Sequence, residues 1–159
     1  MAGELFKVRT GLQTQHIPYK GSAPGLVDLA AGQTQFMIDT INTVLPYVRD
    51  NRLRGLAVTS IKRSSLLPDL PTLAESGMPG FDAAAWQGIV VPTGTPADIV
   101  QKLNAEIVKA LKQPDVQAKL HDQLGMNIVG STPEELAAHM DKEIPRWADL
   151  VKKSGATPD

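Results

Sequence analysis

The stretch that decides the fold is TQHIPYKGSAPGLVDLAAGQTQFMID, residues 14–39. Its first part is β-like and carries a proline that suits the end of a strand. Pro24–Ala31 has the apolar spacing of a helix, and Gly32 supplies a C-terminal stop. Thr34–Asp39 is a compact apolar strand that ends in a carboxylate. The stretch therefore predicts a strand, a helix and a second strand in succession.

The same alternation continues beyond this stretch. A short helix is expected next, with Asn42 or Thr43 as its N-cap, and RLRGLAVTS, residues 52–60, is the following buried strand. A short helix at Thr72–Ser76 and a long strand at Ala84–Pro92 come after it. Nearly continuous apolar strands separated by helices are typical of βαβ units. We therefore predict an α/β fold with a parallel sheet.

Two polar corners lie where predicted strands end. In an open parallel sheet such corners share the crevice outside the carboxyl ends of the strands. The first amides of a helix have no internal partner and the helix dipole is positive there, so a corner of this kind can bind an anion. A plain turn with a helix cap is the alternative for the first corner, and an N-cap or turn residue is the alternative for Asp39. The candidate ligand-binding residues are Tyr19, Lys20, Gly21, Ser22, Asp39 and Thr40.

From about Gly94 onward the chain is dominated by amphipathic helices. Thr95 and Thr132 are each followed by proline and an acidic residue, which predicts two capped helix starts. A shorter helix is expected between them, over residues 114–124. Pro145 interrupts the apolar stripe of the last helix and predicts a kink or a break. The apolar faces of these helices need a surface that this part of the chain does not provide.

Composition excludes several classes of protein and site. Of the 159 residues, 42% are hydrophobic and 21% charged, with a net charge of -1, which is typical of a globular domain and excludes a strongly basic nucleic-acid surface. The chain has no cysteine, and its three histidines lack metal-ligand spacing. No motif for a nucleotide cofactor or a serine nucleophile is present. No metal or cofactor is therefore expected, and an enzyme that uses Asp39 as base beside Lys20 is a minor hypothesis.

The sequence carries no membrane or export signal. No apolar run approaches the roughly 18 residues that span a bilayer. The start, MAGELFKVRTG, has no apolar core of a signal peptide. A periplasmic location is therefore expected only of a longer parent protein, of which this chain is a fragment.

Several blocks carry a resemblance to a known family. HIPYKGSAPGLVDLAAGQTQFMID (16–39), the block from Arg52 to Pro96, GSTPEEL (130–136) and IPRWADLVKKSG (144–155) resemble the substrate-binding receptors of tripartite tricarboxylate transporters, the Bug family. Such receptors are similar to type II periplasmic binding proteins, with two α/β lobes and no catalytic activity. The resemblance implies that only the C-terminal half is present. Residues 1–92 correspond to most of the second lobe with its return strand, and 93–159 to helices that cover the first lobe.

The resemblance also implies a function and its partners. The ligand is a small carboxylate, such as a di- or tricarboxylate or an amino acid, and membrane transporter subunits receive it in the periplasm. Backbone amides and ordered water hold the ligand carboxylates, so the corners at Tyr19–Ser22 and Asp39–Thr40 are expected to converge with unpaired amides. The alternative is a truncated module that binds no ligand and forms a homo-oligomer through an exposed sheet edge.

Overall fold

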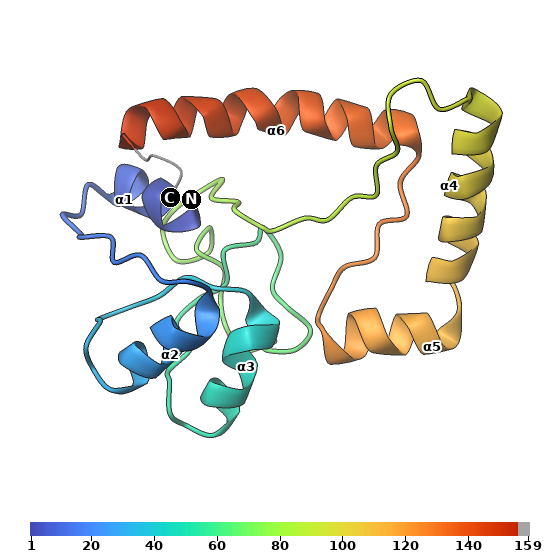
Figure 1. Cartoon of the computed structure of the whole chain (residues 1–159). Helices are drawn as coiled ribbons and strands as arrows, with labels where there is room; N and C mark the ends of the chain where they lie inside the picture. The colour runs from blue at the N-terminus through green and yellow to red at the C-terminus, as the bar shows by residue number, and fades with distance from the viewer. Residues whose placement is uncertain (156–159) are drawn as a thin grey trace. The chain divides into compact units, whose positions relative to one another are not determined.

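The computed structural model describes residues 1–155, and its regular elements are helices joined by extended segments and turns (Figure 1). Residues 1–85 and the described residues from Leu150 onward form one compact unit, and residues 86–149 form a second. Among the described residues, no helix has both the length and the apolar character that a membrane span requires. The helices are α1 (Ala2–Thr10), α2 (Ser22–Ala30), α3 (Ile41–Arg49), α4 (Ala97–Leu111), α5 (Pro114–Gln117) and α6 (Pro133–Ser154).

The two helices predicted in the first half of the chain are present. Helix α2 ends at Ala30, and Gly32 follows in a left-handed conformation with φ of 76°, as its position predicted. Helix α3 begins two or three residues earlier than expected. Its N-cap is Thr40, because the carbonyl oxygen of Thr40 already accepts bonds from the amides of Thr43 and Val44. The predicted cap at Asn42 or Thr43 is therefore wrong.

The predicted strands do not pair into a sheet within residues 1–155. Residues 36–40 and 84–92 run without a ladder, and the sole bridge in this range is parallel, between Val58 and Thr72. It consists of the Val58 amide donating to Pro71 and the Leu73 amide donating to Val58, both at 2.9 Å. A strand is stable only when a neighbour satisfies its backbone groups in register. The extended segments of residues 1–155 therefore lack neighbouring strands.

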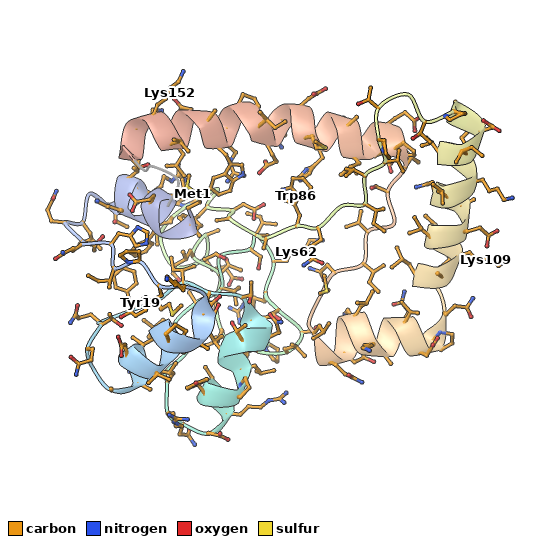
Figure 2. The ribbon with its side chains drawn as sticks, viewed as in Figure 1. Met1, Tyr19, Lys62, Trp86, Lys109 and Lys152 are labelled. Carbon is orange, nitrogen blue, oxygen red and sulfur yellow. The ribbon has the colours of Figure 1, made fainter. Side chains whose placement is uncertain are left out.

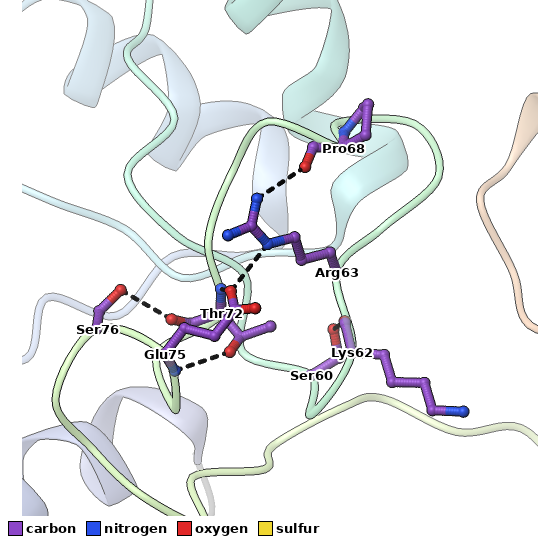
Figure 3. Close-up of polar contacts among 7 residues, drawn as sticks. All are labelled: Ser60, Lys62, Arg63, Pro68, Thr72, Glu75 and Ser76. Atoms are coloured by element: carbon purple, nitrogen blue, oxygen red, sulfur yellow. Dashed lines mark hydrogen bonds and ion pairs between the residues drawn. The ribbon is translucent and has the colours of Figure 1, made fainter.

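The helix predicted at Thr72–Ser76 is instead a turn with a helix-like capping box. The Thr72 hydroxyl accepts from the Glu75 amide at 3.0 Å, and the Glu75 carboxylate accepts from the Thr72 amide at 2.8 Å. Arg63 donates to the same carboxylate at 2.9 Å and to the carbonyl of Pro68 (Figure 3). The glycine at position 77 has a φ of 98° and ends the turn before a second helical turn forms. These bonds fix the connection between residues 60 and 77.

Buried apolar side chains are few. Leu26 of α2 and Leu45 of α3 are buried, together with Phe81 and Leu150, and all four belong to the first unit. Thr72 is also buried, and its polar atoms are bonded within the turn described above. The core of the first unit is therefore formed by one residue each of α2, α3 and α6 together with Phe81.

The second unit contains α4, α5 and most of α6. The Thr132 start is confirmed as a reciprocal capping box with Glu135. The Thr95 start is wrong in detail, because the Thr95 hydroxyl donates to Pro92 and the N-cap is Pro96, without a side-chain cap. The predicted break at Pro145 does not occur, since α6 continues through it. The expected helix over 114–124 is α5 followed by a π-helical turn, Ala118–Gln123.

Candidate functional site

The first candidate corner leads into α2. Gly21 has a φ of 97° and a ψ of 176°, a conformation that only glycine adopts readily. A methyl group at this position would meet no atom within 4 Å, so the backbone here is open to an approaching molecule. The amide of Gly21 donates to the carbonyl of Tyr19 at 2.8 Å. This backbone conformation explains why a glycine occupies position 21. The space beside the glycine is open.

The second candidate corner leads into α3. The Asp39 carboxylate accepts from the amide of Thr40 at 2.7 Å, and the Thr43 hydroxyl donates to the carbonyl of Thr40 at 2.7 Å. The other carboxylate oxygen of Asp39, Oδ2, is buried and has no hydrogen-bond partner among the described residues. A buried carboxylate oxygen repels a second carboxylate. Asp39 therefore orders this corner and is unsuited to bind an anion directly.

The first corner and the approach to the second meet over Gly25. A methyl group on Gly25 would lie 3.1 Å from the terminal carbon of Met37 and 3.2 Å from the ring of Tyr19. Helices α2 and α3 also contact each other within the first unit. Gly25 is buried, so the close packing of Tyr19 and Met37 depends on the absence of a side chain there. This packing brings the chain segments before both helices to one place on α2.

The amide of Ser22 is free, as predicted, but two other corner amides are not. The amides of Gly21 and Thr40 are occupied within the chain, which corrects the expectation that they are unpaired. Neither α2 nor α3 has a side-chain cap at its N-terminus. The amides of Ser22 and Ala23 in α2, and of Ile41 and Asn42 in α3, have no acceptor within residues 1–155. Each helix therefore offers two donors at its positive end.

The side chains of the first corner differ in what they can do. The Tyr19 hydroxyl donates to the Asp28 carboxylate at 2.8 Å, and this bond, with partial desolvation and the charge of Asp28, raises the pKa of Tyr19. Lys20 is exposed and forms no ion pair within the described chain. Ser22 is half-buried at the first position of α2, and its hydroxyl bonds no other described residue. Ser22 and Lys20 are therefore available to a ligand, whereas the Tyr19 hydroxyl is already engaged.

Sequence reasoning missed two residues that shape the first corner, Gly25 and Asp28. Asp28 lies one helical position from the predicted apolar stripe, and its spacing of nine residues from Tyr19 follows no local rule. Gly25 lies inside a helix, where glycine is unfavourable by roughly 1 kcal/mol relative to alanine. A glycine at this unfavourable position was the one indication in the sequence that Gly25 has a packing role.

Trp86, the histidines and a cavity lie outside the two corners. Trp86, which Figure 2 labels, lies on the extended segment before α4. Its ring packs edge-to-face on His139 of α6, with 5.0 Å between the ring centroids. His16 and His121 join no group of ligating side chains, and no cluster of three or more such side chains occurs in residues 1–155. A cavity in the second unit is lined by α4, by Gln117 and by residues 128–130. His16 lies in the first unit and the other features lie in the second, and none of them belongs to the two corners.

Comparison with known sequences identifies the family. The family model described as the tripartite tricarboxylate transporter family receptor matches residues 1–156. The chain belongs to this receptor family. It is 41% identical over 152 residues to a protein from the tcbD–tcbE intergenic region of Pseudomonas sp. (strain P51), covering 95% of this chain and 45% of that protein. It is 40% identical over 153 residues to BugT of Bordetella pertussis, covering 96% and 47%.

This receptor chain spans about half the length of those two relatives. A third relative, from the clcB–clcD intergenic region of Pseudomonas knackmussii, is 38% identical over 152 residues and is covered over 89% of its length. Chains of both lengths are therefore found among the relatives. The predicted resemblance to the Bug receptors is confirmed.

Solved structures support the fold of the receptor chain. The R. palustris protein Rpa4515 with adipate matches with a TM-score of 0.84 and 39% identity, over 99% of this chain and 52% of that one. The periplasmic binding protein BugD matches with 0.80 and 36%, over 97% and 52%. MatC of Rhodopseudomonas palustris with bound malate matches with 0.75 and 35%, over 94% and 52%. The α/β fold class is confirmed, although strand pairing is absent from residues 1–155 taken alone.

Proposed function

We propose that this chain supplies half of the ligand site of a periplasmic receptor, and that this receptor binds a small organic acid for uptake by a tripartite tricarboxylate transporter. The observation that carries the proposal is the family match over residues 1–156. Two solved relatives, which hold adipate and malate, favour a dicarboxylate as the ligand class. Residues 1–92 are assigned to the second lobe and 93–159 to helices over the first lobe.

The two corners are the proposed contact points for one ligand carboxylate. Four unpaired amides, on Ser22 and Ala23 of α2 and on Ile41 and Asn42 of α3, favour an anion. Gly21 leaves room for it, and Lys20 adds a positive charge from solvent. Tyr19 and Asp39 position the corners, through Asp28 and through the Thr40 amide. Closure of a second lobe over these corners would complete the site.

No catalytic step is assigned to Asp39 and Lys20. The matched relatives are receptors and binding proteins. Asp39 already accepts from Thr40, and its second oxygen is buried, so no substrate proton can reach it without displacement of its neighbours. The burial of that oxygen and the bond to the other argue against Asp39 as a general base.

The proposal is tested by nuclear magnetic resonance titration of the chain with adipate and malate. The amide signals of Ser22, Ala23, Ile41 and Asn42 are expected to shift together at millimolar acid, because half a cleft binds weakly. An uncharged diol of the same chain length as adipate is the matched control, and it should leave the four signals unchanged. Shifts confined to other parts of the chain would contradict the proposal.

A pair of substitutions isolates the backbone donor from the hydroxyl. Ser22→Ala removes the hydroxyl alone, whereas Ser22→Pro also removes the amide at the first helical position, where proline is well tolerated. The proline variant should weaken acid binding several-fold more than the alanine variant. Equal affinities in the two variants would remove the Ser22 amide from the site.

A self-associating module without ligand is the second candidate, favoured by the many exposed large apolar side chains. Light scattering tests it directly. A monomer at high concentration would contradict it and leave the receptor proposal intact.

A further inference from the structure

The extended segment 86–91 is held on α6 by an aromatic contact. The chain enters the second unit at Trp86, the first residue of this segment, and leaves it after Asp149, inside α6. The rings of Trp86 and His139 meet edge-to-face with 5.0 Å between their centroids, and both residues belong to the second unit. This contact therefore joins the start of one connection between the units to the helix that makes the other.

The neighbours of His139 lie along one face of α6. A methyl group on Gly88 would lie 3.3 Å from the side chain of Leu136, which precedes His139 by three residues. Glu143 follows His139 by four residues, and this spacing places the two side chains on the same face of the helix. His139 therefore contacts Trp86 between an apolar side chain and a carboxylate.

Glu143 is a charged partner for a protonated His139. Its side chain belongs to a residue that is only 8% exposed. Burial opposes its ionisation, but hydrogen bonds from Trp147 and Arg146 and the charges of Arg146 and His139 outweigh burial and hold the pKa of Glu143 below its ordinary value. Glu143 is therefore ionised above about pH 4.3. Its charge attracts an imidazolium and not a neutral imidazole.

The other charged groups near His139 interact with it less directly. Segment 86–91 contains no charged or titratable side chain. On α6, Glu135 precedes His139 by four residues, but its carboxylate already accepts from a backbone amide at 2.8 Å. Lys142 follows His139 by three residues and is exposed, so solvent and salt screen its charge. Glu143 is therefore the principal electrostatic partner.

Protonation of His139 would also change its contact with Trp86. A neutral imidazole beside an indole is an ordinary aromatic pair. A cation within about 6 Å of the ring centroid is in addition attracted by the indole π-system, and the observed separation of 5.0 Å meets that condition. Histidine changes charge between about pH 5 and pH 8. His139 is exposed, so protons reach it from solvent.

We propose that His139, Trp86 and Glu143 form a protonation-sensitive clamp that holds segment 86–91 on α6 more firmly in mild acid than at neutral or alkaline pH. The clamp is closed while His139 is protonated and Glu143 is ionised, which confines its action to the range above about pH 4.3. Acidification then stiffens the connection that enters the second unit at Trp86. The clamp consists of second-unit residues alone and is independent of the proposed ligand site.

Amide hydrogen exchange of this chain tests the clamp. The matched variant is His139→Phe, which keeps an aromatic ring but cannot be protonated. At about pH 5.5 the amides of residues 86–91 should exchange about two- to fivefold more slowly in this chain than in the variant, the factor expected of an exposed cation–π contact, and at about pH 8 equally fast. Each comparison is made at one pH, so the intrinsic effect of pH on exchange cancels. Equal or faster exchange in this chain at the acid pH, or the same difference at both pH values, would overturn the proposal.

Two further variants cover the case in which the phenylalanine packs differently on Trp86. His139→Lys carries a cation throughout this pH range, so exchange at residues 86–91 should be slow at both pH values. His121→Phe changes the other histidine of the second unit, whose ring bonds Asp122 at 2.8 Å, and should keep the pH dependence of this chain. A pH-dependent His139→Lys, or loss of the pH dependence in His121→Phe, would overturn the proposal.

The indole N–H signal of Trp86 gives a second readout, which packing alone would not move with pH. Nuclear magnetic resonance follows this signal, and Trp86→Phe identifies it, since the chain has two tryptophans. The signal should shift over the same pH range as the imidazole signals of His139, and His139→Phe should abolish the shift. A Trp86 signal that stays constant while His139 titrates, or that shifts equally in His139→Phe, would contradict the clamp.

Discussion

At the scale of single residues, Gly21 determines the path into α2. Its φ of 97° and ψ of 176° lie in a region that other residues enter at a cost of roughly 1–3 kcal/mol. We expect Gly21→Ala to lower the free energy of unfolding by about 1 kcal/mol or more, although the new methyl group meets no neighbour. Urea denaturation measures this change. Gly3→Ala in α1 is the control and should be neutral or slightly stabilising, since Gly3 has open space and no left-handed conformation.

Tyr19 is the second residue whose environment leads to a prediction. The bond to Asp28, with partial desolvation and the Asp28 charge, raises the pKa of Tyr19. We expect Asp28→Asn to lower that pKa toward its ordinary value of about 10. Alkaline absorbance titration measures the change, and Tyr19→Phe identifies the signal, since the chain has two tyrosines. A raised folded-state pKa gives stability that is present below about pH 10. This stability is lost as the pH rises through the pKa of Tyr19 in the folded chain. An unshifted titration in Asp28→Asn would contradict the assignment.

At the scale of elements, helix starts show what local sequence can predict. Thr132 and Glu135 are three residues apart and close a capping box, as their spacing predicted. Thr95 has Asp98 at the same spacing, yet its hydroxyl bonds back to Pro92. The shorter aspartate side chain does not make the return bond to the Thr95 amide, so the helix begins after Pro96. A threonine followed three residues later by an acidic residue predicts that a helix begins. The length of the acidic side chain decides at which residue it begins.

This difference between the two threonines can be measured. We expect Thr132→Ala to destabilise the chain by about 1 kcal/mol, because the amide of Glu135 loses its acceptor. Thr95→Ala should cost less than half as much, since no amide of α4 depends on that hydroxyl. Urea denaturation of both variants gives the comparison. Equal losses would show that the capping box of α6 contributes nothing beyond an ordinary surface hydrogen bond.

Glu143 of α6 makes the stability of that helix depend on pH. Burial opposes its ionisation, but hydrogen bonds from Trp147 and Arg146 outweigh burial and hold the pKa of Glu143 below its ordinary value. A lowered folded-state pKa gives stability that is present above about pH 4.3 and is lost as the pH falls through the folded pKa. In a Trp86→Phe background, we expect the fluorescence of Trp147 to change in that acid range.

Glu143→Gln provides the control for the acid transition. The amide side chain can still accept from Trp147 but no longer titrates, so the fluorescence change below pH 4 or so should be lost. The pKa of Glu75 is also lowered, by the Thr72 amide and by Arg63, and Glu75 is still present in that variant. Any acid transition caused by Glu75 would therefore remain. If the acid-range change in Trp147 fluorescence persisted in Glu143→Gln, it would have to come from a group other than Glu143.

At the scale of the whole molecule, sequence reasoning succeeded for local features and failed for pairing between distant segments. The alternation around residues 14–39 located α2, its glycine stop and both corners, because caps, stops and apolar spacing act over a few residues. A sheet depends on partners far along the chain or on another part of the fold. Residues 84–92 have the composition of a strand and lack a neighbour within residues 1–155. The free amides at Ser22 and Ile41 also required coordinates, since each depends on which neighbour is already bonded.

The small core of this chain leads to the last prediction. Among residues 1–155, the buried apolar side chains are Leu26, Leu45, Phe81 and Leu150, and α4 buries none. Because the denaturant slope m scales with the surface exposed on unfolding, the chain alone should unfold in urea with m near or below about 1 kcal/mol/M. It should also bind an apolar fluorescent dye strongly. Full-length Rpa4515 is the control and should show a steeper transition and weak dye binding. A steep transition without dye binding in this chain would mean that its bare strands and helix faces are already covered, and that they need no partner from the rest of a receptor fold.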